Sequence, residues 1–410
     1  MLNIIWSAFF IVSFIAACVQ CFFFGNPQIW SEIVNQLFST ATSAFQLALN
    51  LTGMLCLWLG LLKIAEKSGL TELLAKALKP LFKVIMPEVP ENSPAIGSIV
   101  MNMAANILGL DNAATPMGLK AMEQLQEINP HKEQASNAQI MFIVINASAI
   151  TVLPISILMY RSLQGSLNPS AVFIPILLAT SCSTIAGFLA VAFTQKLKVF
   201  NRTILLFLLG LLAFVGGIAW YFSTLDIAIR LKYSEIFGNA LILGFITLFL
   251  IFGAVKKLNL YETFINGAKE GFQIAVQIIP YLVAMLAAIA VLRYSGVLDG
   301  VVWCFDKFFA LLGFNTDFIP ALPTALMKPL SGNGARAMMI ETMQNYGADS
   351  FPAFVSSVVQ GSTETTFYVI ALYFGAVKIS QTRSALPCAL FADLIGIIAA
   401  VVLSYIFYQG

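Results

Sequence analysis

Leu330-Ser331-Gly332-Asn333-Gly334-Ala335-Arg336 is a polar, glycine-containing stretch inside the otherwise apolar C-terminal third of the chain. A second such stretch, Gly109-Leu110-Asp111-Asn112-Ala113-Ala114-Thr115-Pro116, lies upstream and also leads into a helical pattern rich in Met and Leu. Each stretch divides an apolar segment, 95–128 or 318–346, into halves too short to cross about 30 Å of hydrocarbon. These segments predict two re-entrant helical hairpins whose polar kinks face the protein interior.

The composition is that of a membrane protein. Of the 410 residues, 59% are hydrophobic and only 10% are charged, which leaves too little polar side chain to cover a globular surface of this size. Apolar runs of about 20 residues recur without the polar alternation of spanning strands, so the spans should be α-helices. The net charge of +2 is near balance, and we expect no nucleic acid partner.

The hydrophobic runs predict an all-α polytopic membrane protein with about nine transmembrane helices. The predicted spans are 4–24, 45–63, 137–159, 171–194, 203–222, 238–255, 272–292, 350–374 and 385–408. The first run has no basic n-region or small-residue cleavage site, so we expect it to be retained. Two amphipathic tracts, 70–85 and 297–312, are expected to lie in the membrane interface.

Lysine and arginine in the loops set the expected orientation. The connection 25–44 carries none, whereas 63–83 carries five lysines, which puts the first outside and the second inside. On the same count, the loop containing Arg161 falls outside. We therefore expect a cytoplasmic N-terminus and a periplasmic or extracellular C-terminus in a bacterial inner membrane.

The chain repeats its own plan. Phe45-Gln46-Leu47-Ala48 matches Phe272-Gln273-Ile274-Ala275, and at the same offset Lys67-Ser68-Gly69-Leu70 matches Tyr294-Ser295-Gly296-Val297. Each copy continues with an amphipathic tract, a kinked hairpin, a span containing Ser and Thr, and a final span.

Five spans separate equivalent positions, so the second copy must be inserted upside down. This is the inverted-repeat plan of secondary transporters, in which broken helices form a site near the bilayer midplane. We expect a first repeat at 1–202, a linker transmembrane helix at 203–222 and a second, inverted repeat at 223–410.

Polar side chains in the first hairpin are candidates for substrate binding. Asn102 and Asn106 lie one helical turn apart on the same face, and we expect them to contact substrate or to line a cavity. Asp111 and Asn112 suit two roles: one of them caps the following helix, in whose first turn Pro116 is tolerated, or they bind a ligand directly.

In the second hairpin, Ser331 and Asn333 accompany glycines that let the backbone approach a ligand closely. A helix starting near Ala335 would point free N–H groups at the kink, which favours a carboxylate or another electron-rich oxygen. Arg336 is a third candidate, and an arginine at this depth in the membrane needs an anionic partner or a hydrated environment. The candidate partners are Glu341, Glu364, Asp111 or a substrate carboxylate.

Two spans carry several polar side chains at their centres, which predicts discontinuous helices that line a cavity. The candidate substrate-binding residues are Asn146, Ser148 and Thr151 in the first span and Gln360, Ser362, Thr363 and Thr365 in the second. Glu364 is the only carboxylate in either segment and is the first candidate for ion coupling, the alternative being a structural partner for Arg336. Asp393, which corresponds to Ser181 of the other copy, is the second candidate.

Nothing in the sequence predicts an enzyme. His131 is the only histidine, which excludes a His-based metal site or a Ser-His-Asp triad inside the membrane, and Cys18-x-x-Cys21 lies in the first span, where we expect simple packing. Gly332-x-Gly334-x-x-Ala337 lacks the βαβ unit and acidic partner of a dinucleotide fingerprint. We expect no cofactor and no metal apart from H⁺ or Na⁺ as a coupling ion.

The two polar motifs carry a family resemblance. The first, from Asn106 to Met122, resembles spore maturation protein A; the second, Ser331–Arg336 together with Gln360–Tyr368, resembles spore maturation protein B. The chain is similar to a fusion of the two. Both families belong to a wider group with the nucleoside recognition (gate) domain, which is similar to part of the concentrative nucleoside transporters. The resemblance implies a transport-type core and leaves the cargo open.

These observations predict a secondary active transporter for a small polar or carboxylate-bearing solute, such as a nucleoside-like molecule, a dipeptide or a small organic acid. The alternative is a membrane scaffold or sensor that keeps a transporter-like pocket without transporting. The expected partners are a small-molecule substrate and the lipid bilayer, and assembly into a homo-oligomer stays open.

Overall fold

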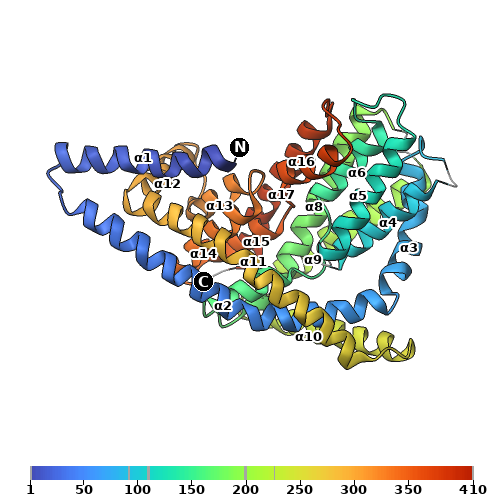
Figure 1. The fold of residues 1–410 in the computed structure, drawn as a ribbon. Coiled ribbons are helices and arrows are strands. Elements are labelled where there is room, and N and C mark those ends of the chain that lie inside the picture. Colours follow the sequence, from blue (N-terminus) through green and yellow to red (C-terminus); the bar gives the residue numbers. More distant parts are fainter. Residues whose placement is uncertain (1, 91–92, 109–110, 198–200, 226, 409–410) are drawn as a thin grey trace.

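The computed structural model describes residues 2–408, apart from 91–92, 109–110, 198–200 and 226. Within these residues the regular structure is helical, with one isolated β-bridge between Gln134 and Gln381 (Figure 1). Seven of the described helices are long and apolar enough to cross a membrane. They are α1 (Leu2–Phe23), α2 (Ile29–Lys67), α8 (Phe173–Thr194), α9 (Arg202–Thr224), α10 (Ile227–Val255), α11 (Leu260–Tyr294) and α17 (Ala385–Phe407). The prediction of an all-α polytopic membrane protein is confirmed.

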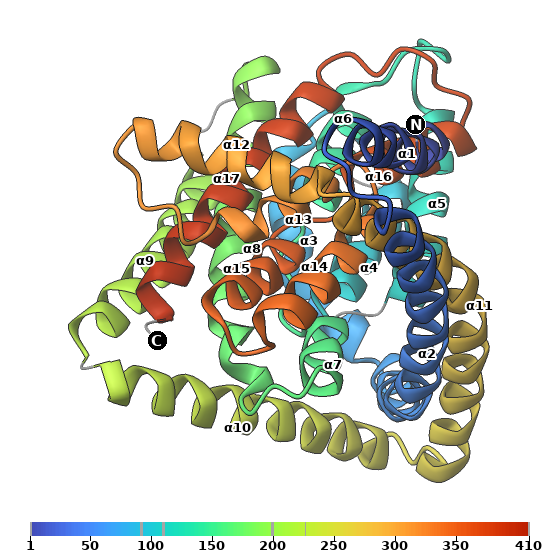
Figure 2. The same cartoon turned by 90° about the vertical axis from the view of Figure 1, so that its left-hand side faces the viewer.

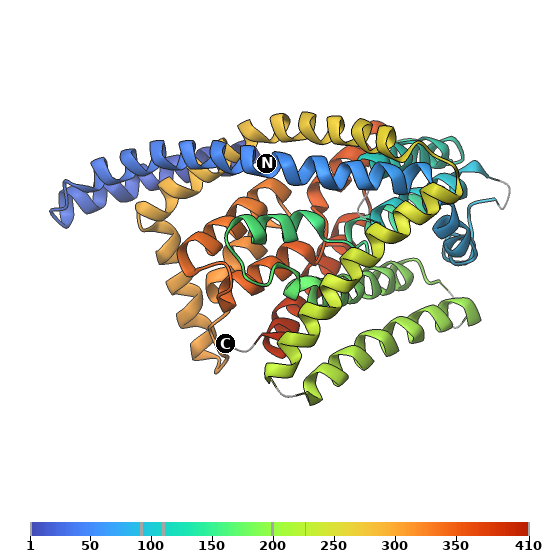
Figure 3. The same ribbon diagram turned by 90° about the horizontal axis from the view of Figure 1, so that it is seen from below.

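Helices α2 and α11 are much longer than the predicted spans. They contain 39 and 35 residues and lie side by side (Figures 2 and 3), while α1 and the first half of α2 extend away from the body of the molecule (Figure 1). The predicted loop at 25–44 is therefore wrong, because α2 already begins at Ile29. Polar residues such as Gln36 and Ser39 lower the hydropathy of this segment without breaking a helix.

Close contact between α2 and α11 depends on small residues. A Cβ atom at Gly271 of α11 would lie 2.6 Å from the Leu55 carbonyl oxygen of α2, and Gly267, one turn earlier, meets Leu59 and Lys63 in the same way. Glycines four residues apart let helix backbones approach closely within a membrane, where packing replaces the hydrophobic effect as the force for association.

We expect Gly271→Ala to lower the free energy of unfolding by about 1–3 kcal/mol, since the added methyl group overpacks a backbone contact. The matched control is Gly244→Ala in α10, where a Cβ atom meets nothing within 4 Å. Thermal unfolding of both variants in detergent measures the difference. Equal unfolding temperatures would mean that the close approach of α2 and α11 is dispensable.

The two matched turns adopt the same conformation. α2 and α11 each end at a serine followed by a glycine in the left-handed region, Gly69 with φ 81° and Gly296 with φ 71°. The hydroxyls of Ser68 and Ser295 donate to the backbone carbonyl three residues earlier. A left-handed glycine is a common helix terminator, and its recurrence after each long helix supports the predicted register of the repeat.

Each turn is followed by one amphipathic helix and then by the helices of one predicted hairpin. In the first half these are α3 (Leu70–Ile85), α4 (Pro94–Ile107) and α5 (Asp111–Glu127). In the second half they are α12 (Val297–Leu311), the short η2 (Ile319–Ala321), α13 (Leu322–Met327) and α14 (Gly332–Tyr346). α3 and α12 match the two predicted amphipathic tracts.

Both predicted discontinuous spans are broken. The first consists of α6 (Asn137–Ala147) and α7 (Ile155–Leu163), and the second of α15 (Phe351–Gly361) and α16 (Thr366–Ala376). Pro154 precedes α7, where a proline interrupts the helical hydrogen-bond ladder. A short helix, η1 (Pro169–Val172), leads from α7 into α8.

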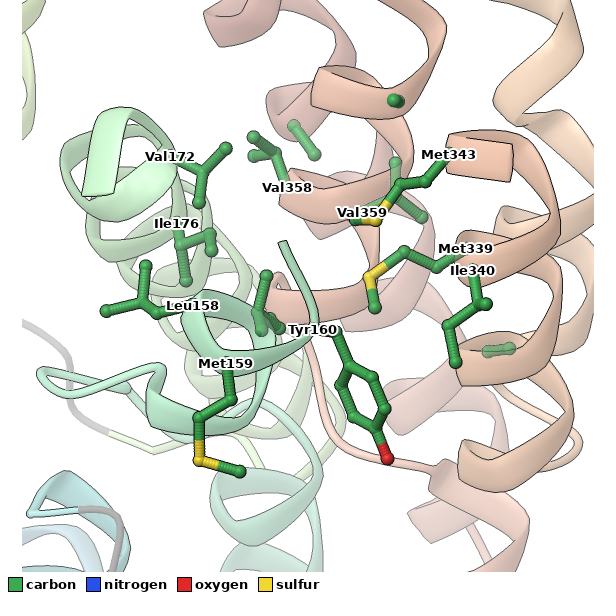
Figure 4. Close-up of a cluster of buried hydrophobic side chains, with 14 of the residues drawn as sticks. Leu158, Met159, Tyr160, Val172, Ile176, Met339, Ile340, Met343, Val358 and Val359 are labelled. Atoms are coloured by element: carbon green, nitrogen blue, oxygen red, sulfur yellow. The ribbon is translucent and has the colours of Figure 1, made fainter. Parts of the chain in front are cut away.

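A buried apolar core joins the two halves where the broken helices meet. Figure 4 shows side chains of α7, η1 and α8 facing those of α14 and α15. The labelled residues are Leu158, Met159, Tyr160, Val172 and Ile176 on one side and Met339, Ile340, Met343, Val358 and Val359 on the other. The breaks, which are the non-helical segments between α6 and α7 and between α15 and α16, are therefore held in place by packing on both sides.

Candidate functional site

A cavity of about 200 Å³ lies where the two broken helices meet α2 and the second hairpin. Its apolar wall comes from α2, with Leu55, Trp58, Leu59 and Leu62. Its polar wall consists of Asn106, Thr151, Ser156, Lys328, Arg336, Gln360, Thr363, Glu364 and Thr365. The lining is thus apolar on one side and polar on the other, and small-molecule sites likewise combine apolar surface with convergent polar groups.

Backbone hydrogen bonds fix the non-helical segments that line the cavity. Val152 N–H donates to the Ile107 carbonyl at the end of α4 (3.1 Å), and Phe367 N–H donates to the Pro329 carbonyl before α14 (3.1 Å). Each break is thus tied to the hairpin of its own half. A third bond, from Glu364 N–H to the Ala147 carbonyl (2.8 Å), joins the two breaks. These bonds satisfy polar groups that unwound backbone would otherwise leave exposed at membrane depth.

Arg336 presents its guanidinium group to the cavity. Its Nη1 donates to Asn333 Oδ1 (3.3 Å), and its central carbon lies 5.5 Å from the centre of the Tyr160 ring. Glu341, one of its predicted partners, pairs instead with Arg293 of α11, so that pairing is wrong. Among the described side chains Arg336 has no carboxylate within ion-pair distance. Most of its donors are therefore available to a ligand.

Three helix N-termini reach the cavity wall. They belong to α7 at Ile155, to α14 at Gly332 and to α16 just after Thr365. The prediction that the hairpin helix begins near Ala335 is wrong, because α14 begins three residues earlier, at Gly332, and Ser331 caps it by accepting a hydrogen bond from Gly334 N–H (3.1 Å). Helix N-termini carry partial positive charge and free N–H groups, which bind anions.

Lys328 is a site residue that the sequence analysis missed. It lines the cavity from the turn before α14, with 4% of its surface exposed. A lysine inside the apolar segment 318–346 was a usable signal, since ionisable residues at membrane depth are usually functional. Glu364 is the only carboxylate in the described lining. The wall therefore carries two cations and one anion.

Seven predicted site residues line the cavity. Those in the wall are Asn106, Thr151, Arg336, Gln360, Thr363, Glu364 and Thr365. Ser331 is the helix cap, and Asn333 accepts the hydrogen bond from Arg336. The side chains of Asp111 and Asn112 lie outside the described residues.

The remaining polar candidates have intramolecular partners. Asn146 accepts from Asn106 Nδ2 (2.9 Å), and Asn102 donates to the Ala114 carbonyl (2.7 Å), so an amide chain runs inward from the cavity. Ser148 and Ser362 are fully buried and donate to carbonyls of the helix that each follows. These bonds position the breaks, and the role of these residues in substrate contact stays a prediction.

Arg161 was predicted to lie in an outer loop, but the structure places it in α7 with 1% of its side chain exposed. It forms an ion pair with Asp349, which precedes α15 (2.9 Å), and donates to the Ala348 carbonyl (3.1 Å). Asp349 also accepts from Leu167 N–H (2.7 Å). This network joins the two halves behind the cavity.

The fold and site define a class: a multi-pass helical membrane protein in which two hairpins and two broken helices surround a polar cavity. The sequence pattern of the nucleoside recognition (Gate) family matches residues 48–164 and 275–380. The chain belongs to this family. Every residue of the cavity wall falls within the two matched ranges.

Two curated proteins of Bacillus subtilis (strain 168) are similar to the chain. Spore maturation protein B is 45% identical over 154 residues, which are 38% of this chain and 85% of the relative. Spore maturation protein A is 36% identical over 187 residues, which are 46% of this chain and 92% of the relative. The predicted resemblance to a fusion of the two is confirmed. No solved structure matches the chain significantly.

Proposed function

We propose that this protein is a secondary active transporter that moves a small carboxylate-bearing solute across a bacterial inner membrane by alternating access. The observation that carries the proposal is the convergence of three helix N-termini, Arg336 and Lys328 on one cavity. Broken helices whose N-termini point at an anionic substrate group are a recurring device of secondary transporters. The predicted inverted repeat would supply the two alternating states.

The cavity favours a solute smaller than a nucleoside. Its volume of about 200 Å³ is below the roughly 300–1,000 Å³ of pockets that hold drug-sized ligands. The apolar side formed by α2 would accept the carbon skeleton, and the polar side would accept the carboxylate. A small organic acid fits both walls, and a nucleoside-like molecule or a dipeptide would need a wider state of the cavity.

A scaffold or sensor is the competing function. Such a protein would be expected to have a dry interior in which every charge is paired. Arg336 faces a cavity without a carboxylate partner among the described side chains, which supports binding of an external anion instead.

Uptake into proteoliposomes tests the transport proposal. The purified chain is reconstituted, and uptake of labelled small organic acids, dipeptides and nucleosides is followed with and without imposed H⁺ and Na⁺ gradients. We expect saturable uptake of a carboxylate-bearing solute that exceeds uptake by protein-free vesicles. No uptake of any of the three classes would contradict the proposal.

Glu364 is proposed to take part in ion coupling, since it is exposed to the cavity beside two cations. We expect Glu364→Gln to abolish solute accumulation driven by an ion gradient. Exchange of external solute for solute loaded inside the vesicles should continue, because exchange does not require the empty carrier to return across the membrane. Thr365→Ser, which keeps a hydroxyl at the neighbouring wall position, is the control. Unchanged gradient-driven accumulation in Glu364→Gln would remove this residue from coupling.

A further inference from the structure

A group of buried oxygen atoms behind the cavity wall has no hydrogen-bond partner. It comprises both carboxylate oxygens of Asp393 in α17 and the hydroxyls of Thr363 and Thr366 at the second break. The three residues are 1%, 4% and 0% exposed. Leaving even one such atom unpaired costs roughly 1–3 kcal/mol. Four together, among the described residues, indicate a missing common partner.

These atoms face one another. The two threonine hydroxyls are polar neighbours of the Asp393 carboxylate, yet neither reaches ordinary hydrogen-bond geometry with it. Oxygen ligands held about 2.4 Å from a hard cation lie roughly 3.4 Å apart around it, farther than hydrogen-bonded oxygens. The two hydroxyls could donate to the two carboxylate oxygens, but the observed positions leave all four oxygens without such a bond, and a cation between them could bind all four.

The surrounding helices reinforce this arrangement. α15 ends at Gly361, so its last carbonyl groups and the negative end of its dipole point toward the break. The methyl group of Thr363 is held against α17, because a Cβ atom at Gly396 would lie only 2.7 Å from it. Thr363 is thereby fixed one helical turn from Asp393.

The first half of the chain provides an internal comparison. In the register that aligns Asn146-Ala147-Ser148 with Gln360-Gly361-Ser362, the counterparts of Thr363 and Thr366 are Ala149 and Val152. The counterpart of Asp393 is Ser181, whose hydroxyl donates to the Leu177 carbonyl (2.7 Å). The same architecture therefore forms without these oxygen groups, so the fold does not require them in the second half.

We propose that Asp393, Thr363 and Thr366 form a binding site for a dehydrated Na⁺ ion. This inference rests on the proposed function: it names Na⁺ as the coupling ion and places the ion behind the cavity wall, where Glu364 contributes its negative charge but is not a ligand. Thr363 belongs both to the ion site and to the cavity wall. An ion bound there orders the segment that contacts the solute.

The charges around the cavity are consistent with joint binding of one Na⁺ ion and one carboxylate-bearing solute. Two cations and two carboxylates, Lys328, Arg336, Glu364 and Asp393, are the charged side chains described at the cavity wall and the ion site. Lys328 and Glu364 both act electrostatically on Asp393. Binding one Na⁺ together with one monocarboxylate leaves this balance unchanged, whereas either ligand alone disturbs it.

The test is thermal unfolding of the purified full chain in detergent, in NaCl, KCl or choline chloride at constant ionic strength and pH. We expect Na⁺ alone to raise the unfolding temperature along a saturating curve, as a ligand of the native state must. Asp393→Asn and Thr366→Val should raise the half-saturating Na⁺ concentration at least about tenfold. Thr366→Ser, which keeps the oxygen, and Ser181→Ala, in the other half, should leave it near the wild-type value.

Equal unfolding temperatures in the three salts, or a response to pH without one to Na⁺, would overturn the site. So would a wild-type Na⁺ response in Thr366→Val, which is nearly isosteric and should fold even where Asp393→Asn does not. Na⁺ stabilisation without uptake of any solute leaves the ion site standing and overturns transport. Uptake of a solute without stabilisation by Na⁺ would leave the transport proposal standing and overturn the ion site.

Discussion

Replacing Arg336 by glutamine is expected to raise the KM for the transported solute roughly a hundredfold. The guanidinium group is a donor at the cavity wall without a carboxylate partner among the described side chains. Loss of its charge-assisted hydrogen bonds with a carboxylate should cost about 3 kcal/mol of binding free energy. The measurement is initial uptake rate against solute concentration in proteoliposomes.

Two further variants control this experiment. Arg202→Gln removes the same charge from an exposed position at the start of α9 and should leave KM unchanged. Arg336→Lys keeps the charge but loses the planar fork that binds a carboxylate through two bonds, so it should fall between wild type and Arg336→Gln. Equal KM values for Arg336→Gln and wild type would show that the solute binds elsewhere.

Removing the partner of Arg161 is expected to give the largest loss of stability. Asp349→Ala leaves an almost fully buried guanidinium group without its carboxylate, and because Asp349 itself is 39% exposed, we expect a cost of about 2–3 kcal/mol, below that of breaking a fully buried pair. Asp299→Ala is the matched control. It removes a carboxylate that pairs with Arg293 but is 59% exposed, and an exposed pair contributes at most about 1 kcal/mol.

Chemical unfolding of the three proteins in detergent gives the comparison. We expect Asp349→Ala to unfold at a clearly lower denaturant concentration than Asp299→Ala, which should behave like wild type. Similar midpoints for the two variants would mean that the network between α7 and α15 does not hold the halves together.

The sequence predicted those features that depend on local polarity. Polar residues in the middle of apolar spans identified both breaks, because charges and amides are tolerated at membrane depth only beside a cavity. The kinks at 109–116 and 330–336 identified both hairpins for the same reason. Seven of the predicted site residues line one cavity, since they belong to these interruptions.

Features that depend on tertiary contacts could not be predicted. The partner of Arg161 is 188 residues away, and loop charges alone placed that arginine in an outer loop. Glu341 could equally have paired with Arg336, and only the packing of α14 against α11 assigns it to Arg293. The helical segment at the start of α2 escaped detection because hydropathy reports spans, not helices.

Accessibility of the cavity from both sides of the membrane tests the central claim most directly, because it does not depend on knowing the solute. Thr151→Cys places a thiol at the cavity wall after the six native cysteines have been replaced. Membrane-impermeant thiol reagents are then applied to either face of oriented vesicles. Alternating access predicts modification from both faces, with the balance shifted by a solute that binds. Modification from one face only, whatever the solute or ion present, would contradict a transporter and favour a sensor.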